Sequence, residues 1–318
     1  MDKIGNRRGS FINYRKPGIF MLTLNKHEGI PYFSKIIRNQ LEPDPFKSIR
    51  PDYSPLGYVI FNTLRNFQEI NPAIHIRQYV IMPDHLHIIT QITEKLEQPL
   101  GNYISIFKKV INKSAIEKSI LKEPGTVFVR GFNDQFLTGG RKLDTLYQYI
   151  KKNPYWLWRR WENPEYFRRI NEMMIGDYNC SLYGNPALLE EPFIYPVVVH
   201  RADVATGVWE KKMELYDYAI ANGGVLVGYF ISKYEKHIFQ KAYEEQGKVI
   251  KLSDRNFASR QKPTGRDLEM CDYGNMLEIT PDLDKYLGSD RTFRQQCLFM
   301  NSFAEEISKG VDLNSLAN

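Results

Sequence analysis

The sequence predicts an α+β domain over residues 1–178 and an α/β domain over residues 179–318. Three observations favour this division. A chain of 318 residues is longer than most single domains. In the first part strand-like and helical segments alternate, which favours a small sheet with helices packed on it. After residue 178 short apolar runs are separated by helical segments, a pattern typical of βαβ units with a parallel sheet.

The first part opens with strand-like segments around one helix. Residues 18–30 are typical of a strand that enters a turn, and residues 54–70 carry apolar residues at helical spacing after a Ser-Pro start. Residues 74–92 read as a strand, a Met-Pro-Asp turn or bulge and a second strand. Because Pro83 cannot donate a backbone hydrogen bond, we expect the chain to kink there, near a sheet edge.

Two further helices and a strand complete the first part. An amphipathic helix is expected over residues 99–120, with its lysines away from an apolar side that is formed by Ile104, Phe107, Ile111 and Ile116. Residues 127–137 are strand-like. A last helix is predicted over residues 142–153, ending at Asn153 because Pro154 disfavours helical geometry in the residue before it.

The second part has the pattern of a parallel sheet. Buried strands are predicted within residues 192–202, 223–232 and 248–252, and a helix within residues 233–247. The boundary between the two domains is expected within residues 176–192.

The charge differs between the two parts. Residues 1–180 contain 27 Lys and Arg and 17 Asp and Glu, a difference of +10, and the remaining 16 and 20 leave residues 181–318 at −4. A basic part beside an acidic part indicates that the first part meets a polyanion. Ordinary surface charge for solubility is the alternative.

The sequence indicates neither export nor a membrane span. The opening residues, MDKIGNRRGSF, lack the apolar run of a signal peptide, and no apolar segment approaches the roughly 20 residues that span a bilayer. Three distant cysteines, Cys180, Cys271 and Cys297, fit neither a disulfide framework nor a zinc knuckle. We therefore expect a cytoplasmic, nucleoid-associated protein.

Two short motifs carry candidate chemistry. His85 and His87 alternate with one leucine, so a strand would present both imidazoles on one face, where they could bind a metal. A pair of solvated histidines is the alternative. Tyr149 and Asn153 are four residues apart on a predicted helix and share a face. An amide oxygen of Asn153 could complete the metal shell, and the Tyr149 phenol could lie beside a polarised phosphate.

These motifs resemble the REP-associated tyrosine transposases, which are single-tyrosine HUH transposases. The resemblance covers residues 7–175, roughly, in the family's order. It rests on NYRKPGIFMLTLNKHEGIPYFSKI, on YVIMPDHLH, where Asp84 stands in place of the usual Asn, and on YIKKNP. FNDQFL lies where the family has Phe-His-Asp, so Asn133 stands in place of a histidine here.

The resemblance implies an HUH endonuclease domain with an antiparallel sheet and packed helices. It implies a divalent metal, Mg²⁺ or Mn²⁺, held by His85, His87 and Asn153, and Tyr149 as a nucleophile that forms a 5′-phosphotyrosine. The substrate would be single-stranded DNA, often at hairpin ends, and the enzyme a monomer or a homodimer. Tyr147 is the competing nucleophile, although a core position is favoured for it, since it lies about 200° around the helix from Tyr149. A replication-initiator-like HUH nickase and a non-cleaving nucleic-acid-binding protein remain alternatives.

Several basic and aromatic residues could contact DNA. Phosphate contacts are expected from lysines and arginines of the first part, and base stacking from a tryptophan: Lys108, Lys109, Lys113, Arg159, Arg160 and Trp156. Packing of the domain's end is the alternative for the tryptophan.

The second domain faintly resembles the Rossmann-like domain of the DNA-processing protein A superfamily, over GGVLVGYFISKYEKHIFQKAYEEQGKVIKL and KPTGRDLEMCDYGNMLEITP. A helix start after a strand could hold a phosphate there. Helix capping by Ser232 and Glu235 is the favoured alternative. We infer no dinucleotide, since a complete Gly-x-Gly-x-x-Gly is missing, and scaffold, dimerisation or partner-docking roles fit equally well.

Overall fold

The computed structural model describes residues 13–309 except 124, 138–139, 201–202, 204–205 and 255–262, and only the backbone of 140–142. The chain divides into two compact units, residues 1–158 and 159–318. Residues 1–158 contain 23 Lys and Arg against 13 Asp and Glu, and the other unit 20 against 24. The predicted charge difference of +10 against −4 therefore also holds for the units as the structure divides them.

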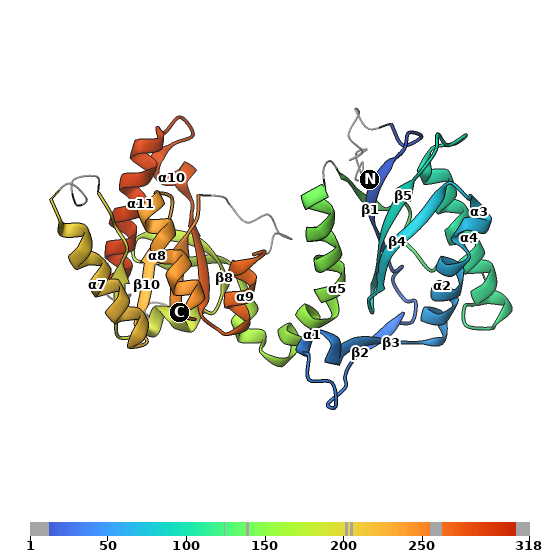
Figure 1. Cartoon of the computed structure of the whole chain (residues 1–318), viewed down its shortest axis with the longest axis horizontal. Helices are drawn as coiled ribbons and strands as arrows, with labels where there is room; N and C mark the ends of the chain where they lie inside the picture. Colours follow the sequence, from blue (N-terminus) through green and yellow to red (C-terminus); the bar gives the residue numbers. More distant parts are fainter. Residues whose placement is uncertain are drawn as a thin grey trace. The chain divides into compact units, whose positions relative to one another are not determined.

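The first unit is built on a four-stranded antiparallel sheet in the order β4-β5-β1-β6 (Figure 1). Its strands are β1 (Gly18–Asn25), β4 (Ile74–Ile81), β5 (His85–Ile92) and β6 (Asn133–Leu137). A smaller ladder joins β2 (Ser34–Arg38) to β3 (Ile49–Tyr53), with the short α1 (Pro45–Ser48) between them. An α+β unit with an antiparallel sheet is compatible with the fold expected for this part.

One face of this sheet packs against three helices, α2 (Pro55–Arg65), α3 (Phe67–Ile70) and α4 (Leu100–Glu117) (Figure 1). Alternate residues of β1 and β5 point into this layer, because side chains of a strand alternate between faces. The largest core cluster forms there, with fully buried residues such as Phe20, Leu22, Leu86, Ile88 and Phe107. The predicted apolar side of α4 is confirmed, since Ile104, Phe107 and Ile111 are buried.

The opposite face is covered by the long helix α5 (Gly140–Glu162) (Figure 1). Ile150, at the middle of the helix, is fully buried against Val80, Met82 and Ile89 of the sheet. The polar positions of β5 lie on this same face, so α5 is the element that approaches the histidine pair.

The prediction that this helix ends at Asn153 is wrong. Pro154 lies inside α5, which continues to Glu162. Proline removes one backbone donor from a helix interior and strains the preceding turn. Here the turns after it are held by packing: Trp156 is buried and contacts Phe46, and Leu157 packs on the Ile150 cluster. Tertiary burial therefore outweighs the local cost of the proline.

Pro83 lies in the short connection between β4 and β5, not within a strand. The edge strand of this hairpin is β4, and β5 is internal. The Pro83 carbonyl accepts a hydrogen bond from the Phe33 amide at 2.9 Å, which ties the turn to the segment before β2.

The second unit contains a six-stranded mixed sheet in the order β7-β8-β12-β11-β10-β9. Four neighbouring strands are parallel: β9 (Ile194–Pro196), β10 (Val225–Gly228), β11 (Lys248–Leu252) and β12 (Met276–Pro281). The predicted parallel arrangement of this part is present. The two added strands are antiparallel: β7 (Arg168–Ile175) and β8 (Tyr178–Gly184).

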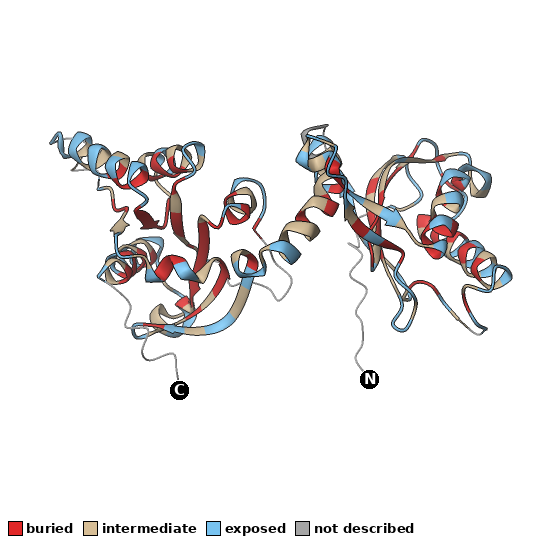
Figure 2. Cartoon of the chain, turned by 90° about the horizontal axis from the view of Figure 1, so that it is seen from below, coloured by how far each residue is buried: buried red, intermediate tan, exposed pale blue. Residues whose placement is uncertain are grey.

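Helices pack on both faces of the second sheet. On one face the core includes residues of α7 (Val208–Ala221), α8 (Lys233–Glu244) and α9 (Arg266–Asp272), and on the other face residues of α11 (Phe293–Ser308). Short pieces connect these layers: η1 (Pro164–Phe167), η2 (Pro186–Glu190) and α10 (Leu283–Leu287). Figure 2 shows the buried residues concentrated in the strands and on the inner helix sides of each unit.

The expected domain boundary at residues 178–179 falls inside the β7–β8 hairpin, and the structure places the division earlier, between Trp158 and Arg159. The reason is long-range pairing, because β8 joins the second sheet through β12. Sequence composition gave no sign of this pairing.

Candidate metal and nucleophile site

His85 and His87 of β5 lie side by side on the α5 face of the first sheet. His85 is opposite Asn25 and His87 is opposite Thr23 in the β1–β5 ladder. The centroids of the two imidazole rings are 4.6 Å apart, with an interplanar angle of 72°. Strand alternation therefore brings both rings into one place, as their spacing predicts.

Each imidazole is held through its Nδ1 atom. His87 Nδ1 is 2.8 Å from Thr23 Oγ1, and His85 Nδ1 is 2.7 Å from Asp84 Oδ1. The hydrogen bond to His85 lowers the pKa of the Asp84 carboxyl, against the effect of its burial. Hydrogen bonds to one ring nitrogen orient a histidine and leave its Nε2 as the ligand atom, which is the usual arrangement in metal sites.

His87 is adapted to remain neutral. Only 6% of the residue is exposed, and this burial, together with the neighbouring His85, lowers the pKa of His87 to about 3, although Asp84 acts in the opposite direction. A neutral imidazole keeps the lone pair that a metal ion requires.

Tyr149 of α5 contacts His87, one of the two histidines. Its ring centroid is 5.6 Å from that of His87 at an interplanar angle of 62°, and 44% of the residue is exposed to solvent. Tyr147 is half-buried and packs on the apolar cluster around Ile150. The two tyrosines therefore have different surroundings, and the phenol next to the histidines is that of Tyr149.

Asn153 lies one turn further along α5 and is only 7% exposed. Its Nδ2 atom is buried and has no hydrogen-bond partner within the described structure. Such an atom carries a desolvation cost of about 1–3 kcal/mol. The two ends of an amide have the same shape, so rotation of the group would place an acceptor oxygen at the unpaired position.

Few side chains at this site could bind a metal ion. Among the described residues, no cluster of three or more His, Cys, Asp or Glu is placed to hold a metal. Two imidazoles and one amide oxygen would leave other positions to water or to substrate oxygens.

The residues predicted to contact DNA have varied surroundings. Lys109 and Lys113 are exposed on α4, with Lys113 Nζ 3.8 Å from Glu117. Lys108 is half-buried and donates to the carbonyls of Val129 and Gly131. DNA contact by these lysines stays a prediction.

The remaining candidates lie near the end of α5 and already contact other residues of the protein. Arg159 forms an ion pair with the buried Asp272 and also contacts Glu162. Arg160 is half-buried and interacts with Tyr183. Trp156 is 8% exposed, so stacking on a base would require it to leave its packing against Tyr155.

Sequence reasoning missed the two residues that hold the imidazoles. Thr23 could have been found only from the register of β1 against β5, which is a long-range property. Asp84 had a local signal, because it directly precedes His85 and differs from the Asn of the resembling family. Asn133 is opposite Thr23 on its other side, in the same row across the sheet as His87.

The similarities of this chain to known proteins are distant. No family model matches the chain. An uncharacterized protein of Haemophilus influenzae is 23% identical over 168 residues, which cover 46% of this chain and 86% of that protein. A solved REP-associated tyrosine transposase bound to a REP hairpin matches 45% of this chain and 70% of its own, with 16% identity and a TM-score of 0.31. Neither similarity by itself assigns an activity. No helix among the described residues is long and apolar enough to cross a membrane.

Proposed function

We propose that this chain is a metal-dependent endonuclease and strand transferase of single-stranded DNA, with Tyr149 as its nucleophile. One observation carries the proposal: the Tyr149 ring contacts His87 on the sheet face where His85 lies beside it. A phenol next to two oriented imidazoles suits phosphoryl transfer at a metal-bound phosphate. The basic balance of residues 1–158 supports a polyanionic substrate.

The proposed cofactor is a divalent ion, Mg²⁺ or Mn²⁺, which two imidazoles and one amide oxygen would hold together with water or substrate oxygens. His85 and His87 would bind it through Nε2, since their Nδ1 atoms are engaged by Asp84 and Thr23. The unpaired buried amide of Asn153 supports its role as the third ligand. When bound, the ion would supply polarisation of the scissile phosphate and neutralisation of the charge that develops there.

Tyr149 would perform the covalent step. Its Oη attacks phosphorus while the bond from phosphorus to the 3′ oxygen breaks, so the 5′ phosphate becomes esterified to the tyrosine. The phenol proton passes to solvent, which reaches the exposed ring, and the departing 3′ oxygen takes up a proton to become a hydroxyl. The phosphotyrosine ester keeps the bond energy, so the 3′ hydroxyl of another strand can reverse the step and join DNA.

The test is cleavage of a labelled hairpin oligonucleotide taken from the DNA that flanks the gene. With Mg²⁺ or Mn²⁺ we expect nicking and a covalent protein–DNA adduct that survives a denaturing gel. With EDTA we expect neither. Binding without cleavage under all these conditions would instead favour a non-cleaving nucleic-acid-binding protein.

A transposase and a replication-initiator-like nickase would share this chemistry and differ in the DNA on which they act. Short inverted repeats that flank the gene or are scattered through the genome would favour transposition. A single site near a replication origin would favour a replication-initiator-like nickase.

A further inference from the structure

A basic pocket of about 400 Å³ lies between α4 and residues 126–132. It is on the face of the first sheet that α4 covers, and α5 covers the other face. Such a volume is within the range of small-ligand sites. Its lining combines cations with polar and apolar groups: Lys108, Lys109, Arg130, Ser105, Ile104 and Phe132. Among the described residues that line it, none is an aspartate or a glutamate. The composition therefore favours an anionic ligand that also has an apolar part.

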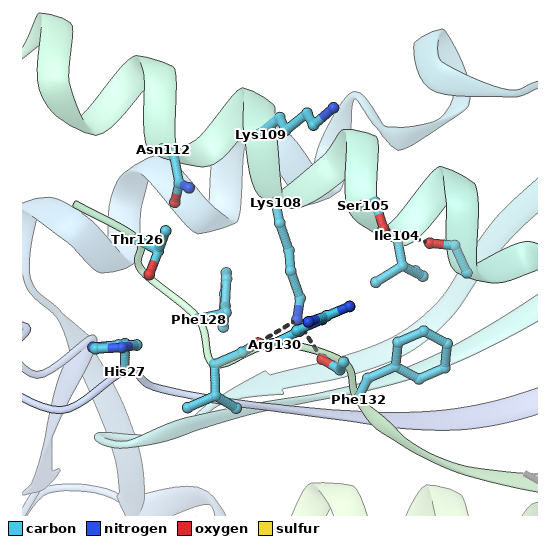
Figure 3. A pocket seen from close by; sticks show the side chains of 13 residues that line it. His27, Ile104, Ser105, Lys108, Lys109, Asn112, Thr126, Phe128, Arg130 and Phe132 are labelled. Carbon is cyan, nitrogen blue, oxygen red and sulfur yellow. Dashed lines mark hydrogen bonds between the residues drawn. The ribbon is translucent and has the colours of Figure 1, made fainter. Parts of the chain in front are cut away.

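The walls of the pocket are tied together by side chains. Lys108 reaches from α4 across the pocket, and its ammonium donates to the carbonyls of Val129, at 2.8 Å, and Gly131 (Figure 3). The Asn112 side chain accepts from the Val127 amide at 2.9 Å. These bonds join the helix to the segment across the pocket.

Lys108 has capacity for an anion. An ammonium has three donors, and two of them are used by the carbonyls. Burial lowers the pKa of Lys108 to about 8, so the side chain is mostly charged at neutral pH, and no carboxylate among the described residues that line the pocket balances this charge. The exposed Arg130 also lines the pocket and is labelled with Lys108 in Figure 3. Two cations that line one pocket suit the oxygens of a phosphate group.

The pocket lies at the same end of the sheet as the histidines. The Val129 amide donates to the Asn25 carbonyl at 3.0 Å, and Asn25 is opposite His85 in the β1–β5 ladder. Two spacings between neighbouring backbones, roughly 10 Å, separate residues 129 and 85. One DNA strand could therefore pass around the sheet end from the pocket to the histidines within a few nucleotides.

We infer that this pocket binds one nucleotide of the single-stranded DNA substrate, its phosphate on Lys108 and Arg130 and its base against the apolar lining. The inference rests on the proposed function only for the identity of the polymer. It adds a second anchoring point, separate from the histidine pair, that would fix which phosphate reaches Tyr149.

The test measures binding of a fluorescent single-stranded oligonucleotide by anisotropy in EDTA, so that no cleavage is needed. Arg130→Ala removes a phosphate contact, and Ser105→Phe fills the pocket without changing charge. For each we expect affinity about tenfold lower, and for Arg130→Ala a slope of log affinity against log salt about one unit smaller. Lys118→Ala is the matched control, because it removes one charge from the exposed end of α4 outside the pocket.

Each outcome decides the question. Equal effects of Arg130→Ala and Lys118→Ala, or wild-type binding by Ser105→Phe, would reduce the pocket to general surface charge and overturn the inference. Binding of a free deoxynucleotide that Arg130→Ala and Ser105→Phe both weaken, while both variants bind the oligonucleotide normally, would assign the pocket to a free nucleotide and would also overturn the inference.

Cleavage of the hairpin oligonucleotide is measured in parallel to separate the two proposals. If binding depends on the pocket but no cleavage occurs, the pocket inference stands and the proposed nuclease activity is rejected. If cleavage occurs but binding does not depend on the pocket, the proposed nuclease activity stands and the pocket inference is rejected.

Discussion

The two sheets of this protein use burial in different ways. In the first, β5 presents apolar residues to the α2–α4 layer and the histidine pair to the α5 face, where Tyr149 remains 44% exposed. In the second, β10 and β12 are buried at every position, with helices packed on both faces. The first unit is also basic and the second acidic.

This difference indicates where the chemistry lies. A sheet face that is covered by a single helix can expose side chains beside that helix, whereas a sheet between two helical layers serves packing first. We therefore place the proposed catalysis and DNA binding in the first unit. For the second unit a scaffold, dimerisation or partner-docking role stays a prediction, as does its kinship to Rossmann-like domains.

The largest expected effect is on the nucleophile. Tyr149→Phe removes one oxygen and little volume, so we expect loss of the covalent adduct and a fall in cleavage of about 10³-fold or more. Tyr147→Phe, two residues away and packed on the Ile150 cluster, is the control and should keep the adduct. Trapping on a denaturing gel, followed by peptide mass spectrometry, identifies the attachment site. A DNA-modified peptide centred on Tyr147 or Tyr155 would contradict the assignment.

The metal ligands should come next. We expect His85→Ala and His87→Ala each to lower cleavage by about 10²-fold or more while single-strand binding is largely kept, because the basic residues lie elsewhere. Circular dichroism should confirm the fold, since His87 is buried. Full cleavage by both folded variants would remove the metal site.

Asn153 allows function and stability to be separated. Asn153→Leu should lower cleavage by about tenfold or more, through loss of a metal ligand. Its free energy of unfolding should stay the same or rise by about 1 kcal/mol, because an unpaired buried amide is replaced by an apolar group. Denaturant unfolding and the cleavage assay measure the two quantities. A large loss of stability with normal cleavage per folded molecule would show that the amide only supports packing.

The charge difference between the units predicts where DNA binds. A fragment of residues 1–162, which keeps α5 whole, should bind single-stranded DNA at least about tenfold more tightly than residues 163–318, with affinity that falls steeply as salt rises. Anisotropy at two salt concentrations tests this expectation, once both fragments are shown to fold. Tighter binding by the second fragment at equal salt would reverse the roles of the two units.

The smallest effect is expected for Asp84→Asn. Asp84→Asn keeps an acceptor for His85 Nδ1 and should lower cleavage only a few-fold, whereas Asp84→Ala removes that acceptor and should cost about tenfold or more. Equal activity of the wild type and both variants would show that His85 needs no support from this residue.

Much of the fold follows from local patterns in the sequence. The histidine-bearing hairpin, the α4 helix and the parallel strands of the second unit lie where period and turn residues predict them. The capping box of Ser232 and Glu235 is also confirmed at the start of α8. These features depend on neighbours within a few residues, so alternation, helical spacing and capping are sufficient to locate them.

Other features depend on contacts between distant residues, and only the tertiary structure decided them. The path of α5 through Pro154 depends on packing against Phe46 and the sheet, and the division at Trp158 and Arg159 depends on the pairing of β8 with β12. The hydrogen bond between Thr23 and His87 likewise depends on the register of β1 against β5. The hydrogen bond between Asp84 and His85 depends on the side-chain rotamer of Asp84. The sequence by itself determined which residues share a face of a strand or helix, because that follows from backbone periodicity. Which faces meet is set by burial across the whole chain, and that placed His87 beside Tyr149 and Tyr147 against the apolar core.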